Sequence, residues 1–317
     1  MNFGMWPSPV KALALGARDR RFESCHPDNT MAFLTKLIND NQTIELEKFD
    51  GSHFTSLPTD YSNDHSTKIC FLDLETTGLN TQDCKIIEFA AKLTAIDNTS
   101  GELLGIVDEY QSFNDPEEMI DPLITKITGI DNSTVEGHSI DWESVSHILN
   151  NADIVVAHNA QFDRAVMDRC LPLSQEQVWL CSMKDINWME RGLNARGQEI
   201  LCIWHGFYYD SHRAMFDVDA LIHLVTYNVE GLNNAVLELL INATKPTYKI
   251  IALNSDFDKK DLLKARRYIW NAPKRYWWKN LTSEEVDNEK EWMASHIYNG
   301  DFQGRIDEIA LTDKHKF

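Results

Sequence analysis

Short apolar runs separated by turn-forming residues follow a polar beginning of the chain. Lys68–Leu74 is such a run and predicts a buried strand, and the runs IIEFAAKLTAI and ELLGIVDEYQSF predict two more. The turn-forming stretch Asp97–Gly101 separates the last two runs. A β-meander is the simplest arrangement of these three strands.

Helical and strand patterns then alternate along the chain, and no internal repeat is present. The predicted elements are a helix near Asp141–Leu149 with Asp141 as its N-cap, a strand at Ala152–His158, a helix at Phe162–Cys170, a strand at Val178–Met183 and an amphipathic helix at Arg213–Val225. A meander followed by alternating strands and helices predicts a mixed α/β sheet.

The same patterns divide the chain into four parts. Residues 1–30 precede Met31 and include the basic stretch VKALALGARDRRFESCHPD, which resembles the translation of a tRNA gene; we expect a non-native or disordered segment without function. Residues 31–65 are polar and end in TDYSNDHST, which predicts an N-terminal extension and linker. Residues 66–230 contain the mixed sheet, and residues 231–317 predict a small C-terminal α+β module.

Within this C-terminal module, two aromatic alternations flank a turn at Asn271–Lys274. Tyr268 alternates with Trp270, and Tyr276 with Trp278, which predicts a β-hairpin with aromatic rings on one face. A helix at Glu284–Tyr298 and a final strand at Arg305–Leu311 complete the predicted module.

Composition excludes several classes of protein. The chain of 317 residues is 43% hydrophobic and 25% charged, as in ordinary soluble globular proteins. No apolar run approaches the roughly 18 residues of a membrane span, and the N-terminus lacks the apolar core of a signal peptide. The six cysteines show no CxxC spacing, which argues against a zinc site and suits reduced thiols. We therefore expect a cytoplasmic protein without membrane contact.

The net charge of −19 is unusual for a protein that touches nucleic acid, but the charges are segregated. Residues 66–230 hold 27 Asp and Glu against 10 Lys and Arg, whereas residues 245–280 hold 10 Lys and Arg against 3 Asp. An acidic region suits bound cations, which supply positive charge at a phosphate. The basic region has the footprint expected of a nucleic-acid binder.

Five residues in distinctive contexts are candidates for catalysis. Asp73 and Glu75 lie two apart at the end of a predicted strand, so both side chains point to one face, where a buried unpaired carboxylate would be costly. Asp163 falls in the first turn of a predicted helix, where an acid also suits the helix dipole, and His212 and Asp217 flank the start of another helix. Four carboxylates and an imidazole can hold two divalent cations and activate a water, which is phosphodiester hydrolysis. We assign His158, His205 and His223 to structure and expect Asp219 to be solvated.

The motifs FLDLETTGL, HNAQFD and HRAMFD resemble the three motifs of the DEDDh 3′→5′ exonucleases, over about half of the chain. That group includes proofreading subunits of replicative polymerases and RNA-trimming enzymes. The resemblance implies a ribonuclease H-like fold with a five-stranded mixed sheet, metal ligation by the four carboxylates and His212 as the base. Two departures are Thr128, where many relatives have His, and Phe216, where relatives often have Asp; neither is one of the five core positions.

The expected mechanism is in-line attack by water on the terminal phosphodiester. Asp73 would bridge two Mg²⁺ or Mn²⁺ ions about 3.5–4 Å apart, with Glu75 and Asp217 on one ion and Asp163 on the other. His212 would take the proton. The resemblance also implies that the backbone of Thr76, Thr77, Gly78 and Leu79 cradles the terminal nucleotide. Phe162 is either a stacking group or a core residue.

The basic module offers a second candidate surface, because aromatic rings interleaved with cations suit single-stranded nucleic acid. The alternative is a small core that buries its Trp residues. The candidate residues are Lys264, Arg266, Arg267, Trp270, Lys274, Arg275 and Trp278.

Together these features predict a metal-dependent 3′→5′ exonuclease that releases nucleoside monophosphates from single-stranded ends in repair or proofreading, with DNA favoured over RNA. The alternatives are an RNA-trimming exoribonuclease and a catalytically weak nucleic-acid-binding adaptor. A polymerase-bound proofreading subunit is a third possibility, but the chain shows no clamp-binding motif, so a standalone enzyme is favoured.

Overall fold

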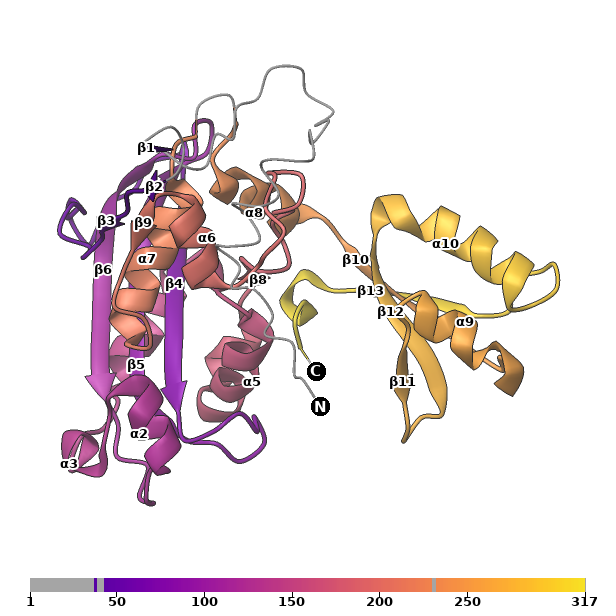
Figure 1. Cartoon of the computed structure of the whole chain (residues 1–317), viewed down its shortest axis with the longest axis horizontal. Coiled ribbons are helices and arrows are strands. Elements are labelled where there is room, and N and C mark those ends of the chain that lie inside the picture. Colours follow the sequence, from indigo (N-terminus) through magenta and orange to yellow (C-terminus); the bar gives the residue numbers. More distant parts are fainter. Residues whose placement is uncertain (1–36, 39–42, 230–231, 317) are drawn as a thin grey trace.

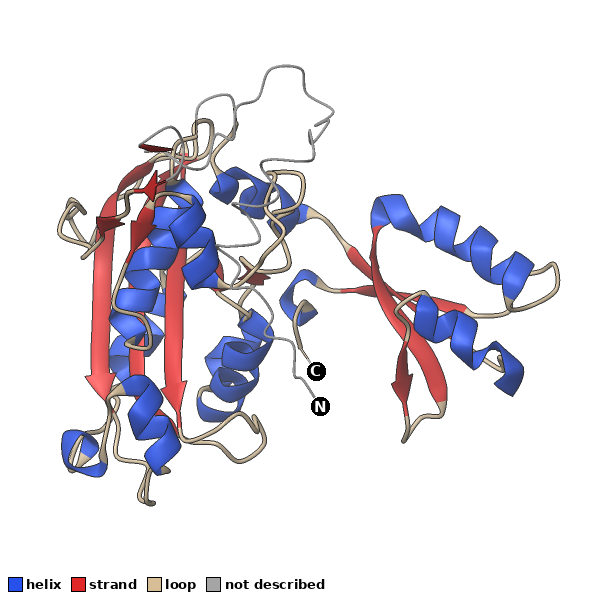
Figure 2. Cartoon of the chain, in the orientation of Figure 1, coloured by secondary structure: helices blue, strands red, loops and turns tan. Residues whose placement is uncertain are grey.

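The computed structural model describes residues 37–38, 43–229 and 232–316, and the chain forms two lobes (Figure 1). The first lobe is built on a five-stranded sheet and the second on a four-stranded sheet (Figure 2). The expectation for residues 1–30 lies outside the described residues. Among the helices of the described part, none is long and apolar enough to cross a membrane.

The five-stranded sheet has the order β6-β5-β4-β7-β8, in which β5 is antiparallel to β4 and β6, while β4, β7 and β8 run parallel. The predicted mixed sheet is therefore confirmed. Its long strands come from apolar runs, and β5 is buried on both faces over nearly its whole length. The strands are β4 (Ser66–Thr76), β5 (Ile86–Asp97), β6 (Leu103–Phe113), β7 (Ile154–Ala157) and β8 (Trp179–Cys181).

Helices cover both faces of this sheet. On one face, α6 (Gln198–Trp204), α7 (Ala214–Thr226) and α8 (Ala235–Thr244) share a core with Phe71 of β4. On the other, α4 (Trp142–Asn150) and α5 (Ala160–Cys170) share a core with Leu72. Because side chains alternate along a strand, Asp73 and Glu75 fall on the Phe71 face, where α7 packs.

The predicted elements of this lobe are present with small shifts at their ends, and Asp141 caps α4 by accepting hydrogen bonds from the backbone N–H groups of Glu143 and Ser144. The expectation that Asp219 is solvated is wrong: it is buried on α7 and forms an ion pair with Lys92 of β5 at 2.6 Å. The remaining elements are β1 (Leu37–Ile38), β2 (Thr43–Ile44), β3 (Glu47–Lys48), α2 (Pro122–Thr128), α3 (Asn132–Val135), η1 (Pro172–Glu176) and β9 (Phe207–Tyr208).

Part of the expected N-terminal extension packs onto this lobe. β3 pairs with β9 in parallel, and the Phe49 ring stacks on His223 with centroids 4.2 Å apart. Burial lowers the pKa of His223 to about 4, and it does the same for His158 and His205. All three histidines are thus largely neutral structural groups at pH 7, as assigned from the sequence.

The second lobe has the sheet order β11-β12-β10-β13, with every neighbouring pair antiparallel. The predicted hairpin is present, but Trp270 lies opposite Trp277, and Trp278 lies opposite Ile269. The prediction that its aromatic rings share one face is therefore wrong, since a shift of one residue in register exchanges the faces. The elements are β10 (Thr247–Ala252), η2 (Phe257–Lys259), α9 (Lys260–Ala265), β11 (Ile269–Asn271), β12 (Tyr276–Thr282), α10 (Ser283–His296) and β13 (Arg305–Ile309).

After β13 the chain returns to the first lobe through η3 (Leu311–Asp313), as the yellow segment in Figure 1 shows. We call residues 311–316 the return strap. The fully buried Arg164 guanidinium of α5 donates hydrogen bonds to the backbone carbonyls of Thr312 and Lys314. The Lys314 ammonium donates to the carbonyl of Asn242 at 2.7 Å, and His315 Nε2 lies 2.7 Å from Asp185 Oδ2. The strap therefore anchors the second lobe on α5 and α8.

Replacing Arg164 by Met is expected to lower the free energy of unfolding by about 2–4 kcal/mol, because two buried strap carbonyls lose a charged donor. Urea unfolding of both proteins measures the change. Arg196→Met, at an exposed arginine, is the control and is expected to change it by less than about 0.5 kcal/mol. Equal stability of Arg164→Met and the parent protein would show that the strap contact contributes nothing.

Candidate active site

Three of the predicted ligands meet at the end of β4. Asp73 and Glu75 project from the strand, and Asp217 comes from the first turn of α7. Each offers a carboxylate oxygen such that these oxygens lie within 4.8 Å of one another. The sequence prediction that Asp73 and Glu75 share a face with Asp217 nearby is confirmed by this geometry.

Asp163 joins the site from the other side of β4, in the first turn of α5. Its side chain is only 3% exposed, and its charge raises the pKa of Asp73. Asp163 is not within the tight group of three, but it lies close enough to interact electrostatically with Asp73 and Asp217. The structure therefore brings together carboxylates from one strand and two helices.

Crowding and burial raise the pKa of all four carboxyl groups. Burial is the main cause for each, and repulsion by Asp217 adds to it for Asp73, Glu75 and Asp163. The pKa of Glu75 and of Asp163 rises to about 8, and that of Asp73 rises well above its usual value. Such a group of buried oxygens is charged at pH 7 only at a high electrostatic cost, which bound cations would remove.

His212 lies in the turn before α7 with a left-handed backbone conformation, φ 65°. Its side chain is 52% exposed, and its Nε2 lies 3.9 Å from Glu199 Oε1. The charge of His212 lowers the pKa of Asp217, so the imidazole stands beside the carboxylate cluster. An exposed imidazole at the edge of buried acids is placed to exchange protons with solvent.

Asp217 is held by groups that the sequence did not single out. The Tyr209 hydroxyl donates to Asp217 Oδ1 at 2.7 Å, and the Arg213 backbone N–H donates to Oδ2 at 3.1 Å. The Gln198 amide in turn donates to the Tyr209 oxygen at 3.0 Å and to the Asp217 carbonyl at 2.8 Å. These bonds fix the Asp217 carboxylate in one orientation.

Glu88 of β5 is a second support that sequence reasoning missed. It is fully buried, lies opposite Glu75, and accepts hydrogen bonds from the Arg213 guanidinium on both oxygens, at 3.1 and 3.0 Å. It also accepts from the backbone N–H of Ala214 at 3.1 Å. Glu88 therefore holds the turn that carries His212 and the start of α7. An acid inside the apolar run IIEFAA was the available signal.

The predicted nucleotide-cradling segment follows Glu75 directly. Thr76 is buried and donates its hydroxyl to the carbonyl of Gly78 at 2.7 Å, which closes a turn. The Thr77 backbone is paired with Lys85 across the turn at 2.9 Å. Leu79 is 88% exposed, and open space surrounds the α-carbon of Gly78. Phe162 is half-buried against the core that contains α5.

The chemistry of the donor set fits divalent cations. Every donor is a carboxylate oxygen, which hard ions such as Mg²⁺ and Mn²⁺ prefer. The described cysteines lie outside this cluster and are unpaired thiols, so sulfur ligands play no part in it.

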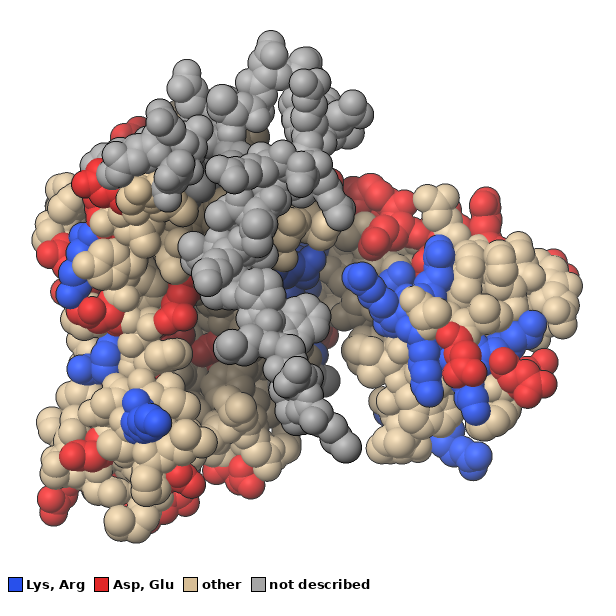
Figure 3. Space-filling view, viewed as in Figure 1, with Lys and Arg blue, Asp and Glu red and all other residues tan. Residues whose placement is uncertain are grey.

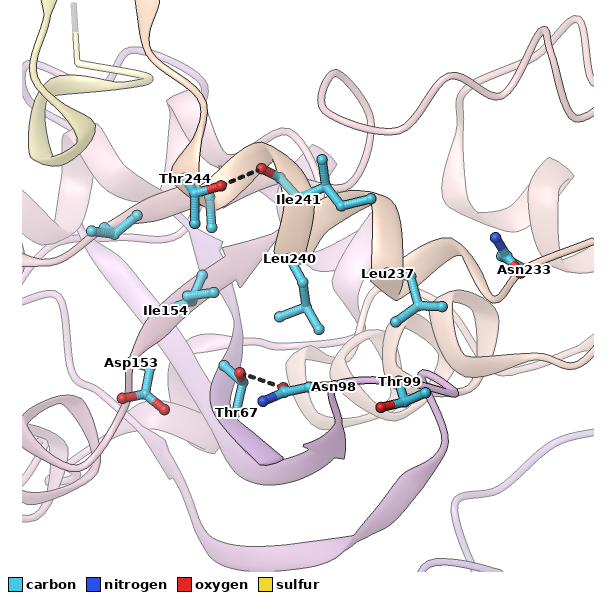
Figure 4. A pocket seen from close by; sticks show the side chains of 12 residues that line it. Thr67, Asn98, Thr99, Asp153, Ile154, Asn233, Leu237, Leu240, Ile241 and Thr244 are labelled. Atoms are coloured by element: carbon cyan, nitrogen blue, oxygen red, sulfur yellow. Dashed lines mark hydrogen bonds between the residues drawn. The ribbon is translucent and has the colours of Figure 1, made fainter. Parts of the chain in front are cut away.

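A separate hollow of about 620 Å³ lies at the opposite end of the sheet, where β4 and β7 begin (Figure 4). Apolar side chains of α8, including Leu237 and Leu240, line one wall of it. Thr67 and Asn98 are hydrogen-bonded to each other there, and the Asp153 carboxylate is occupied by the backbone N–H of Lys68. The hollow carries no group of acids like that at the end of β4.

A ribonuclease H-like sheet with acids at the end of its central strand is the arrangement found in a class of nucleases. Comparison with known proteins indicates the same class. Residues 70–225 match the family model of the RNase_T exonucleases. This part of the chain is thus similar to that exonuclease family, and Asp73, Glu75, Asp163, His212 and Asp217 all lie within it.

Curated relatives are PolC-type DNA polymerases III. The PolC-type polymerase of Caldanaerobacter subterraneus subsp. tengcongensis is 40% identical over 93 residues, which cover 29% of this chain and 6% of the relative. The PolC-type polymerase of Halalkalibacterium halodurans is 26% identical over 238 residues, which cover 66% of this chain and 16% of the relative. The chain thus spans less than a fifth of the length of these relatives.

Among solved structures, the chain is similar to Exonuclease X in complex with 5′ overhanging duplex DNA. Identity is 24% and the TM-score 0.39, over 54% of this chain and 99% of the other. It is also similar to E. coli Exonuclease I in complex with a dA16 oligonucleotide, with 15% identity and a TM-score of 0.45, over 68% of this chain and 63% of the other.

Without metal, the raised pKa of these carboxyl groups makes the fold less stable as pH rises. The folded-state pKa of Glu75 and Asp163 is about 8 and the ordinary value about 4, so stability is lost between those two pH values. Asp73→Asn removes one of the repelling charges. In EDTA at pH 8 it is expected to raise the unfolding free energy, because the pKa of Asp73 is raised in the folded state.

Thermal unfolding of both proteins at pH 4.5 and pH 8 measures this difference, which should vanish at the lower pH. Asp60→Asn, at an exposed carboxylate, is the control. A lower melting temperature of Asp73→Asn than of the parent protein at pH 8 in EDTA would contradict the repulsion argument.

Glu88→Gln is expected to lower turnover by about 10- to 100-fold, because one side-chain oxygen of Gln cannot serve all the donors of Arg213 and Ala214. The parent protein and Glu88→Gln are compared by kcat and KM on a single-stranded substrate. Urea unfolding of both proteins shows whether stability has changed as well. Gln111→Ala, which removes a different donor to Glu88, is the control. Unchanged kcat in Glu88→Gln would rule out this positioning role.

Proposed function

We propose that this protein is a metal-dependent 3′→5′ exonuclease that releases nucleoside monophosphates from single-stranded ends, DNA in preference to RNA. The observation that carries the proposal is the convergence of Asp73, Glu75 and Asp217, with Asp163 and His212 beside them, at an accessible end of the sheet. Residues 66–230 are the exonuclease unit in this proposal, and residues 231–317 are an accessory module.

In this proposal the four carboxylates would hold two Mg²⁺ or Mn²⁺ ions. Asp73 is the acid that interacts with all three of the others. A bound metal pair supplies an acidified water and stabilises the charge that develops on the leaving 3′ oxygen. The Tyr209 and Arg213 hydrogen bonds hold Asp217 in place while the substrate reacts.

His212 accepts the proton of the attacking water in this proposal. Its position on an exposed turn lets the imidazole reach a substrate above the carboxylates and then pass the proton to solvent.

The terminal nucleotide lies against Thr76–Leu79 in the proposal. Gly78 has no side chain and open space around it, so the sugar-phosphate backbone of a nucleotide can come close to it. The exposed Leu79 side chain offers an apolar surface to a base. Phe162, half-buried at the N-terminal end of α5, supports this surface from below or stacks on the base. These contacts recognise an end and a sugar rather than a base sequence.

DNA is the favoured substrate because the curated relatives are DNA polymerases, which also supports a role in DNA repair or proofreading and an association with a polymerase. The five described cysteines are unpaired, as suits the reducing cytoplasm.

Degradation of 5′-labelled single-stranded DNA and RNA of one sequence tests the proposal. A ladder that shortens from the 3′ end in Mg²⁺ or Mn²⁺, and stops in EDTA or with Asp73→Ala, is expected. His212→Ala should lower kcat by about 10²- to 10⁴-fold while Mn²⁺ binding persists. His147→Ala, at an exposed histidine of α4, should retain activity.

Shortening from the 5′ end, or cleavage that continues in EDTA, would overturn the proposed reaction. Faster removal of nucleotides from RNA than from DNA would keep the reaction and replace the proposed substrate by RNA. Tight binding without cleavage of either strand would favour a nucleic-acid-binding adaptor.

A further inference from the structure

The second lobe has one face of its sheet covered and the other free of its own helices. Its elements follow the order β10-α9-β11-β12-α10-β13, a split βαβ arrangement with β10 and β12 in the centre of the sheet. Leu263 of α9 and Met293 of α10 pack in one cluster with Ile250 and Leu281 of the sheet. Figure 1 accordingly shows both helices on the same side of the strands.

The other face, which we call the open face, is defined by the strand register. Ile251 lies opposite Trp278 on one side and Arg305 on the other, and Trp278 lies opposite Ile269. These four residues form one row across the whole sheet. Tyr276, two residues before Trp278, is on the same face.

The row and its neighbours combine apolar, aromatic and cationic side chains of differing exposure. Ile269 is 55% exposed, whereas Ile251 beneath the centre of the row is fully buried. Lys249 Nζ lies 4.6 Å from the centre of the Trp278 ring, and Arg305 extends the row at the edge, where Asp307 pairs with it at 2.9 Å. Trp278 is partly buried and lies beside this apolar centre.

Two of the residues predicted from the sequence lie on the helix side of the sheet and not on the open face. Arg266 is on the helix side, where Glu289 pairs with it at 3.2 Å and the Trp292 ring stacks against it at 4.6 Å. Trp270 is also on that side, tilted against Trp277. Figure 3 shows Lys and Arg side chains gathered on this lobe. Trp278, with Lys249 beside its ring, is on the open face instead.

We propose that the open face, formed by Lys249, Ile269, Tyr276, Trp278 and Arg305, binds a single strand of nucleic acid by stacking bases on its aromatic rings. Flat rings on the central strands of a four-stranded sheet offer every base a π-face, and neighbouring cations neutralise the phosphates. Residues 245–280, which contain Lys249, Tyr276 and Trp278, have 10 Lys and Arg against 3 Asp in a chain of net charge −19, so this segment favours a polyanion.

This inference deepens the proposed function and rests on it for the identity of the strand. The return strap holds the lobe on α5, the helix that carries Asp163. A strand bound on the open face would therefore be kept near the carboxylates while its 3′ end is shortened. Long strands gain from this contact, and a dinucleotide is too short to reach both surfaces.

The test compares two tryptophans of the same hairpin on opposite faces. Binding of a fluorescent 20-nucleotide single-stranded DNA is measured by anisotropy in EDTA for the parent protein, Trp278→Ala and Trp270→Ala. Trp278→Ala is expected to weaken binding by about 10-fold or more, since stacking of one base is worth roughly that factor. Trp270→Ala is expected to change it by less than about twofold.

Three further measurements keep the test informative. Trp278→Phe retains a ring and should recover most of the binding, which a folding defect would not explain. Replacing both Lys249 and Arg305 by Gln should lower the slope of log Kd against log salt by about 1.4, the value for two phosphate contacts on a single strand. Hydrolysis of a dinucleotide by Trp278→Ala should equal that of the parent protein.

Absent binding by the parent protein, unchanged binding by Trp278→Ala, or an equal loss in Trp270→Ala would overturn the open-face proposal. Loss of dinucleotide hydrolysis in Trp278→Ala would also overturn it, because the residue would then act on the catalytic lobe. If the parent protein binds the strand but hydrolyses no dinucleotide in Mg²⁺ or Mn²⁺, the exonuclease proposal fails while the binding surface stands.

Discussion

Mutual repulsion among buried carboxylates at the end of β4 is the constraint on which the rest of the structure depends. Burial raises the pKa of Asp73, Glu75, Asp163 and Asp217, and the charge of Asp217 adds to the rise for the other three. A protein keeps such a group only if surrounding structure prevents it from relaxing. The same repulsion is what makes the site a strong ligand for cations, because ion binding relieves it.

The surrounding frame is built from rigid elements that meet at one point. Asp73 and Glu75 are on β4, the central strand, which pairs with β5 on one side and with β7 on the other. Tyr209 and the backbone of Arg213 hold Asp217, and Glu88 holds Arg213 from the next strand. Glu88 is itself an acid close to Glu75, so its charge is neutralised by a guanidinium rather than by the metal site. The frame thus separates a structural carboxylate from the ligating ones.

The sequence predicted the mixed sheet, its main helices and the meeting of Asp73, Glu75 and Asp217, because strand alternation and motif context are local signals. It did not predict that Glu88 and Tyr209 support the site, or that Asp219 pairs with Lys92. Glu88 and Lys92 lie far from their partners in the chain, and Tyr209 lies close to Asp217 but outside the motif HRAMFD. The hairpin was predicted, but its register was not: turn residues indicate where strands reverse, while the pairing of Trp270 with Trp277 depends on the whole sheet.

The return strap has a consequence for how the protein is made. Residues 311–316 leave the ribosome after every element of both lobes, yet they supply the acceptors for Arg164, the neighbour of Asp163 on α5. A nascent chain that has emerged only through α8 holds that guanidinium without its carbonyl partners, which costs stability in the helix that bears a ligand. The helix that bears Asp163 therefore gains two of its hydrogen bonds only once residues 311–316 have been synthesised and have folded back onto it.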